Sequence, residues 1–375
     1  MSAIRATPLH GRTAALNPCN RWTERNGFTL ARDFGDASAE ALAARTTVMM
    51  ADISWRWRVF IEGARAAEFL SRLVTRKVAA LAPGESVKAL WLNDGGAVRG
   101  AGVVARFASD KFLLISAATD IDWIASAAAL YDVSLRDVTE AEAGIAIAGP
   151  YAKSVLDALG IDPALETLRF RKLFSRRLDI TLSCWGELAG YELWCAGDDS
   201  YLLWDALAKT GVPFGMRAAG LDATDILDIE AGILRPHRDY RAAVDGFASE
   251  PVPASLGLES LIDEAHMVFN GRPAWLANRS AAKTSAVGIE IDSETPAPFA
   301  PLLRNGVQVG HTMTSVASPF LRRAIALAQV DASASAPGTE LQLPLPLSLN
   351  NAIAKPVRAR VIELPFTKPP APSTR

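Results

Sequence analysis

The pattern of hydrophobic and polar positions predicts alternating short strands and helices in the first part of the chain. Residues 55–63, WRWRVFIEG, alternate as a strand does, and the following ARAAEFLSRLV spaces its apolar residues as a helix does. KALWLND and AVRGAGVVARF predict a hairpin, because Gly95 and Gly96 between them suit a tight turn. The next expected strands are FLLIS, VSLRDV and GIAIAGP, and the next helices are TDIDWIASAAALY and YAKSVLDALG.

The same order of elements recurs in the middle of the chain. RLDITLSCWG and YELWC predict strands, and SYLLWDALAKTG and LDATDILDIEAG predict helices. From about residue 280 the chain is rich in short strands separated by Gly and Pro, which predicts a small barrel or sandwich. We therefore expect an α+β protein with mostly antiparallel sheets. The expected division is 1–150 with an N-terminal extension, 151–280, 281–366, and a disordered Pro-rich tail at 367–375.

The strand YELWC places a carboxylate in aromatic company. Its period of two puts Tyr191, Leu193 and Cys195 on one face and Glu192 and Trp194 on the other. On the strand pattern alone, the favoured interpretation is a half-buried strand whose Glu192 face meets water. The alternative is a buried carboxylate that binds a ligand.

Composition and charge exclude several classes of partner. The chain has 375 residues, of which 50% are hydrophobic, so it can form two or three domains. Its net charge of −2 and the absence of a basic run argue against nucleic-acid and membrane-surface partners. The sequence contains neither a signal-peptide pattern nor a membrane-spanning apolar segment, so we expect a cytoplasmic protein.

The usual short motifs of catalysis are missing. Three cysteines without CxxC spacing and four scattered histidines predict neither a disulfide framework nor a metal site. There is also no GxSxG elbow, phosphate-binding GxxxxGK[ST] loop or GxGxxG after a strand. The sequence therefore gives no motif-based indication of a hydrolase, a nucleotide triphosphatase or a dinucleotide-binding enzyme.

Several segments together carry a family resemblance. In chain order they are MMADISWRWRVFIEGARAAEFLSRLV, WLNDGGAV, IAIAGP, CWGELAGYELW, DIEAG, VFNGRPAW, HTMTSVASPFLRRAIALAQV and VRARVIELPF. They resemble, in the same order, motifs of the aminomethyltransferase family, which comprises the folate-binding T-protein of glycine cleavage and its relatives. The resemblance implies ferredoxin-like α/β domains around a central hole, plus a C-terminal β-barrel at 281–366. It also implies that 1–150 and 151–280 together bind tetrahydrofolate, with the pterin deep and the glutamate tail outside.

The resemblance implies a role for the carboxylate of YELWC. Glu192 matches the family's glutamate that recognises the pterin, whose amino group and ring N–H can both donate to one carboxylate. With the resemblance, we favour this binding role over the water-facing alternative. Trp194 would cover the ring or simply pack, and Glu187 would stabilise the turn or contact the cofactor.

The sequence departs from the family pattern at informative positions. Arg99 and Gly100 stand where the T-protein has an aspartate, Ser116 replaces an asparagine, and Asp228 replaces an arginine. Together with TDIDW and PVPASLGLESLID, these departures look more like the tetrahydrofolate-dependent demethylases. The leading hypothesis is a tetrahydrofolate-dependent one-carbon transferase, moving a methyl or aminomethyl-derived carbon from a small methylated donor. The alternatives are a glycine-cleavage aminomethyltransferase, whose partner would be a lipoyl carrier protein, and a non-catalytic folate-binding protein.

Each candidate site residue has a structural alternative. Arg99 would hold a substrate carboxylate or face solvent. His237 would move a proton or simply be exposed, and Tyr191 would act as an acid or close the pocket wall. Arg238 would attract the folate tail or belong to a solvated loop. The candidate catalytic residues are Arg99, Tyr191 and His237, and the candidate cofactor-binding residues are Glu192, Glu187, Trp194, Ser116 and Arg238.

Overall fold

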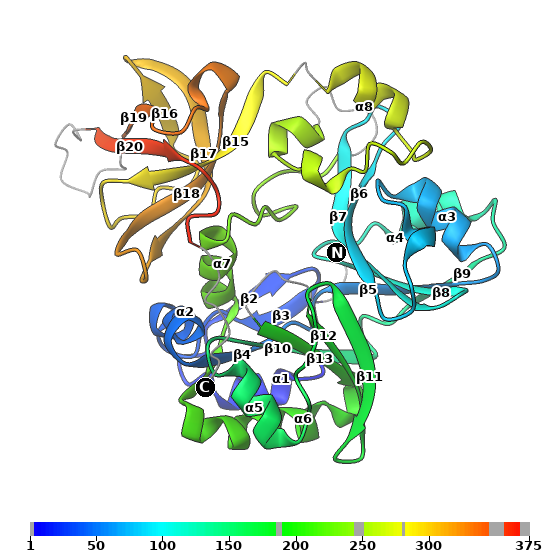
Figure 1. The fold of residues 1–375 in the computed structure, drawn as a ribbon. Coiled ribbons are helices and arrows are strands. Elements are labelled where there is room, and N and C mark those ends of the chain that lie inside the picture. The colour runs from blue at the N-terminus through cyan, green and yellow to red at the C-terminus, as the bar shows by residue number, and fades with distance from the viewer. Residues whose placement is uncertain (1–3, 185–189, 244–250, 280–281, 345–355, 368–375) are drawn as a thin grey trace.

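The structure is a computed structural model that describes residues 4–184, 190–243, 251–279, 282–344 and 356–367 (Figure 1). These residues form a five-stranded sheet, a six-stranded sheet, a small three-stranded sheet and a closed barrel. The three-stranded sheet consists of β1 (Arg5–Ala6), β3 (Phe28–Ala31) and β2 (Trp22–Arg25), with α1 (His10–Ala15) beside it. None of the helices in the described ranges combines the length and apolar character needed to cross a membrane.

The five-stranded sheet carries the predicted glycine hairpin. Its order is β6 (Ser86–Leu92), β7 (Val98–Ala108), β8 (Lys111–Ser116), β5 (Trp57–Glu62) and β9 (Ser134–Asp137). Helices α3 (Ala66–Leu73) and α4 (Ile121–Ala128) bury their apolar sides against one face, where Phe69 and Ile124 meet Trp57 and Trp91. Because one face is covered in this way, side chains of the opposite face remain for contacts with the rest of the molecule.

The six-stranded sheet takes strands from distant parts of the chain. Its order is β11 (Arg169–Ser175), β12 (Leu178–Cys184), β13 (Gly190–Ala196), β10 (Glu142–Ala148), β4 (Val48–Asp52) and β14 (Met216–Ala219). Helices α5 (Ala152–Leu159) and α6 (Ser200–Gly211) pack on the face that carries Leu193 and Cys195. Helices α2 (Ala37–Thr46) and α7 (Leu221–Glu230) pack near β4 and β14. The sheet thus includes strands from both sides of residue 150.

The C-terminal part, for which the sequence predicted a small barrel or a sandwich, forms a closed barrel. Its closed order is β15 (Thr284–Ile291), β18 (Arg323–Asp331), β17 (Val307–Ser318), β16 (Pro301–Arg304), β19 (Glu340–Leu343) and β20 (Val357–Ile362). Ala, Val, Leu and Ile side chains fill its interior. Figure 1 shows the barrel beside α7, whose Ile229 packs against Met313, Ile325 and Leu327. The α+β fold with a C-terminal barrel is therefore confirmed.

The hairpin between β6 and β7 reaches toward α8 (Arg272–Asn278), as Figure 1 shows. Gly96 in its turn has φ +78°, and a Cβ there would lie 2.6 Å from the backbone nitrogen of Trp275. Glycine is therefore required both for the turn and for this close approach. The contact holds the hairpin so that its open face lies beside the segment after α7 and the short 3-10 turns Pro253–Leu256 and Glu259–Leu261.

Candidate active site

A cavity of about 220 Å³, here called the central pocket, lies on the open face of the five-stranded sheet. Strands β7 and β8 contribute Val103 and Ile115, and Leu234 after α7 and Leu258 contribute further apolar walls. The polar groups at its border include Arg56, Lys88, Ser116 and Arg235. Among the described residues that line it, none is aspartate or glutamate. The pocket therefore combines apolar walls with cationic side chains.

Glu192 lies directly behind one of these cations. Its side chain is almost fully buried, and its Oε1 accepts a hydrogen bond of 2.5 Å from Nη1 of Arg56, which is buried as well. Its Oε2 accepts a hydrogen bond of 3.1 Å from Nε1 of Trp194. Arg56 borders the central pocket, and Glu192, which is not among the described lining residues, adjoins the pocket through this ion pair. The water-facing alternative for Glu192 is thus wrong.

Trp194 is enclosed on the same side of β13. Only 2% of it is exposed, and the guanidinium of Arg58 lies 3.9 Å from the centre of its ring. Arg58 also forms an ion pair with Glu142, and burial lowers the pKa of the Arg58 guanidinium, while Glu192 raises it. The indole therefore packs beneath a cation and orients Glu192 through its N–H.

Tyr191 lies on the opposite face of β13, as the alternation predicts. It packs beside the hydrophobic core between the sheet and helices α5 and α6, away from Glu192. Burial raises the pKa of its hydroxyl, with further upward contributions from Cys184 and nearby aspartates. Tyr191 is therefore half-buried against this layer, and it is absent from the described lining of the central pocket. Glu187 lies outside the described residues.

Ser116 borders the central pocket at the end of β8. Its hydroxyl donates to the carbonyl oxygen of Ala101 at 3.0 Å and accepts from the backbone N–H of Ala118 at 3.3 Å. The side chain is buried and ties β8 to β7. Its hydrogen bonds therefore fix the wall of the pocket.

Arg99 is held by an acidic partner. Its Nε and Nη2 donate to Oδ2 and Oδ1 of Asp120 at 3.0 and 2.9 Å, which is the two-pronged geometry typical of arginine and carboxylate. Asp120 also accepts from Nε1 of Trp91, and the Arg99 guanidinium lies 4.6 Å from the ring centre of Trp123. Arg99 is not among the described residues that line the central pocket. Its charge is used to fix the start of α4.

His237 and Arg238, the two candidate site residues in the segment after α7, are not among the described residues that line the central pocket. His237 is exposed, with a backbone φ of +65°. Arg238 is buried among Asp225, Asp228 and Asp239. Burial lowers the pKa of Arg238, but the surrounding aspartates raise it further, so that the guanidinium stays charged. Arg238 therefore holds this segment in place, which agrees with the alternative of a loop with internal ion pairs, although its guanidinium is largely buried and not solvated.

Sequence reasoning did not predict Lys88 or Arg56 as site residues, and it considered Arg235 only within the basic run RPHRDYR, which could attract the folate tail. Lys88 is on β6, and Arg235 follows α7 in the run RPHRDYR. The alternation of KALWL gave a usable signal, because it places Lys88 on the same face as the buried Leu90 and Leu92. A lysine on an otherwise apolar strand face is uncommon unless it meets a charge or a ligand.

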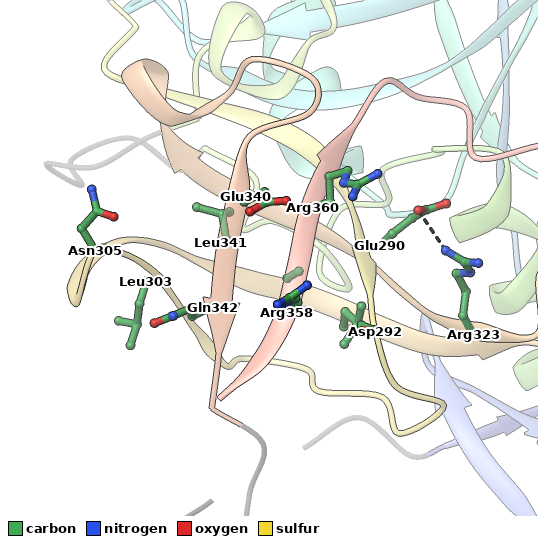
Figure 2. A pocket seen from close by; sticks show the side chains of 12 residues that line it. Glu290, Asp292, Leu303, Asn305, Arg323, Glu340, Leu341, Gln342, Arg358 and Arg360 are labelled. Atoms are coloured by element: carbon green, nitrogen blue, oxygen red, sulfur yellow. Dashed lines mark hydrogen bonds and ion pairs between the residues drawn. The ribbon is translucent and has the colours of Figure 1, made fainter. Parts of the chain in front are cut away.

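A second cavity, of about 400 Å³, lies on the barrel (Figure 2). Figure 2 shows acidic and basic side chains alternating over its strands, and Glu290 pairs with Arg323 at 3.1 Å. Arg358 and Arg360 stand near Glu340 and Gln342 on the neighbouring strand. Because both signs of charge are mixed here, this cavity has no evident preference for one class of ligand. No group of three His, Cys, Asp or Glu able to hold a metal ion occurs in the described ranges.

Comparison with known families decides the relationship. The model of the GCVT N-terminal domain matches residues 9–256, and that of the glycine cleavage T-protein C-terminal barrel domain matches residues 285–368. The chain belongs to the glycine cleavage T-protein family. The expected aminomethyltransferase resemblance is therefore confirmed, and with it the T-protein-like fold.

Curated relatives and a solved structure agree with this assignment. An aminomethyltransferase of Clostridium botulinum is 26% identical over 344 residues, covering 88% of this chain and 90% of the relative. One from Bacillus pumilus is also 26% identical, covering 82% and 86%. The glycine cleavage system aminomethyltransferase T of Bartonella henselae has a TM-score of 0.85 at 20% identity, covering 97% and 98%. This last match shows the shared fold.

Aminomethyltransferases of the glycine cleavage system use tetrahydrofolate, the cofactor expected from the sequence. The donor set of this T-protein family member can accommodate a pterin. A carboxylate has about four acceptor sites. Glu192, which accepts hydrogen bonds from Arg56 and Trp194, is such a carboxylate. Val103, Ile115 and Leu234 supply apolar surface for a flat ring. A bound pterin would share Glu192 with Arg56.

Proposed function

We propose that this chain is a tetrahydrofolate-dependent one-carbon transferase of the aminomethyltransferase type, and that its reaction takes place in the central pocket. The observation that carries the proposal is the buried Glu192 carboxylate paired with Arg56, which borders an apolar cavity within the family's fold. Glu192 also matches the glutamate that recognises the pterin in the family motif, and this match supports a binding role.

The protein residues act mainly by positioning. Glu192 would accept hydrogen bonds from the pterin edge, and Arg56 and Trp194 hold its two oxygens in a fixed direction. The apolar walls would exclude water from the reacting centre, which strengthens these polar contacts. Tetrahydrofolate supplies a nucleophilic nitrogen that accepts the one-carbon unit. Such transfer depends chiefly on alignment of donor and acceptor.

The names of the relatives favour one class of donor. The similar curated proteins are called aminomethyltransferases, and this supports an aminomethyl group delivered by a lipoyl carrier protein. Under this form of the proposal, the carrier protein is the partner. It requires that the chemistry proceed without a carboxylate at position 99, where this chain has Arg99 paired with Asp120.

That same ion pair favours the second candidate, a small methylated donor. Because Arg99 is engaged by Asp120 beside Trp123, position 99 offers no anion to an aminomethyl group. Methyl transfer to folate needs alignment and leaving-group stabilisation more than a local carboxylate. We therefore keep both donors within the proposal and separate them by assay.

Calorimetry with tetrahydrofolate tests the binding role of Glu192. The Glu192→Gln variant should bind at least about tenfold more weakly, since an amide loses charge-assisted hydrogen bonds and presents a donor of its own. Glu290→Gln, a change on the barrel surface, is the matched control and should bind as the wild type does. Equal affinities in all three proteins would refute the assignment of Glu192.

Product analysis separates the donors. The protein is incubated with tetrahydrofolate and either an aminomethyl-loaded lipoyl carrier protein or a panel of methylated sulfonium, amine and methoxy-aromatic compounds. Methylenetetrahydrofolate formed only with the carrier supports the aminomethyl donor, and methyltetrahydrofolate formed with the panel supports the small donor. Folate binding without either product would replace the proposal by the non-catalytic folate-binding alternative.

A further inference from the structure

The charges around the central pocket are unequal. Three cations, Arg56, Lys88 and Arg235, border it, and no acidic side chain among the described residues does so. Two of these cations have carboxylates next to them: Glu192 pairs with Arg56, and Asp228 pairs with Arg235 through two contacts of 2.9 Å. The arginines are thus fixed and largely compensated.

Lys88 differs from both arginines. It lies on β6 with its backbone paired to Val103, and its side chain is half-buried at the pocket border. Its side chain makes no ion pair or hydrogen bond with any residue that the structure describes. Its neighbours on this strand face, Leu90 and Leu92, are fully buried. An ammonium beside apolar walls is poorly compensated, so an anion that reaches it gains more than it would in bulk water.

The charges at the pocket border indicate the charge of the ligand. Once Glu192 is set against Arg56, and Asp228 against Arg235, one positive charge remains at the pocket border, that of Lys88. A monoanion matches this remainder, and a carboxylate presents two oxygens that can accept from an ammonium and from a neighbouring guanidinium together. The cavity of about 220 Å³ limits the ligand to a small molecule or to one end of a larger one.

We propose that Lys88, which borders the central pocket together with Arg56 and Arg235, forms a carboxylate-binding subsite and holds the carboxylate of a small donor substrate. The donor role rests on the proposed one-carbon transfer, whereas the anion subsite itself does not. A carboxylate can also come from the glutamate tail of folate. The experiment therefore treats the two sources separately.

The first arm measures carboxylate binding alone. Thermal unfolding is followed in rising propionate or propionamide at constant ionic strength, for the wild type, Lys88→Met, Lys88→Arg and Lys153→Met. Lys153 is an exposed lysine on α5 and serves as the matched control. Propionate should raise the melting temperature of the wild type, Lys88→Arg and Lys153→Met above the value in propionamide, and this difference should vanish in Lys88→Met. The proposed subsite is refuted if propionate and propionamide give the same melting temperature in the wild type, or if their difference persists in Lys88→Met.

The second arm identifies the source of the carboxylate. Calorimetry compares tetrahydrofolate with 6-methyltetrahydropterin, which lacks the glutamate tail, in the wild type and Lys88→Met. If Lys88→Met changes the affinities for tetrahydrofolate and 6-methyltetrahydropterin by less than about twofold, the carboxylate at Lys88 comes from the donor substrate. A loss of tenfold or more for tetrahydrofolate alone assigns Lys88 to the tail and overturns the donor assignment. If the wild type binds neither compound, the proposed function fails, while the propionate result still decides the subsite.

Discussion

The buried ion pair between Arg56 and Glu192 gives a sharp test of the site. Its side chains are only 9% and 10% exposed, so removal of one partner leaves a buried charge without its main counterion. Two unit charges about 4 Å apart at an effective dielectric constant of about 20 interact by about 4 kcal/mol. Loss of one member of a buried pair lowers stability by about 3–5 kcal/mol. We expect Arg56→Met to lower the free energy of unfolding by this amount.

A double-mutant cycle measures the coupling. Urea unfolding is recorded for the wild type, Arg56→Met, Glu192→Gln and the double variant, with Arg65→Met and Glu68→Gln as the same cycle on an exposed pair. The double variant should recover most of the stability lost by either single change, because neither buried charge remains. The exposed pair, with side chains 47% exposed, should couple by less than about 1 kcal/mol.

Two results would refute the reasoning. Single changes at Arg56 or Glu192 that lower stability by less than about 1 kcal/mol would mean that the pair is not buried in solution. Strictly additive effects in the double variant would mean that the two side chains do not interact. Hydrogen exchange of the β13 amides provides a local readout, since a loosened Glu192 should speed exchange there before the barrel is affected.

Three further predictions concern Gly100 and the cysteines. Gly100→Ala should lower the free energy of unfolding by about 1–3 kcal/mol in urea titrations, because the new Cβ would lie 2.2 Å from the ring of Trp91; a change below about 0.5 kcal/mol would contradict this. Burial raises the pKa of the Cys195 thiol to about 12, so iodoacetamide at pH 8 should modify the exposed Cys19 and spare Cys195 in the native protein. Because the unfolded thiol loses its proton near pH 9 and the folded one only near pH 12, this residue's contribution to stability should fall as the pH rises between these values, and Cys195→Ala should remove that part of the pH dependence.

The local elements could be predicted because each depends on short-range pattern. The alternation in YELWC fixed which side chains share a face, and the structure shows Glu192 and Trp194 together on one side of β13. The glycine turn between β6 and β7 and the C-terminal strands were also visible in the sequence. These features need only the periods of strand and helix and the backbone freedom of glycine.

The roles of individual charges could not be predicted in the same way. Arg99 was a candidate for a substrate contact, and the structure pairs it with Asp120. Arg238 was a candidate for the folate tail, and the structure surrounds it with aspartates. Asp120 and Asp225 lie on other parts of the fold than the arginines they pair with, so these distances depend on how the elements pack. A charged residue in a sequence therefore indicates that its side chain meets water or a partner, but the sequence does not identify that partner.

The sequence by itself determined the α+β class, the barrel, the family and the face on which Glu192 stands. Only the tertiary structure decided that Arg56 meets Glu192 across a separation of 136 residues, and that Lys88 borders the same cavity as Arg235. Periodicity sets the direction of a side chain within its own strand. The order of strands in a sheet and the packing of one sheet beside another set what that side chain faces, and these depend on contacts between distant parts of the chain.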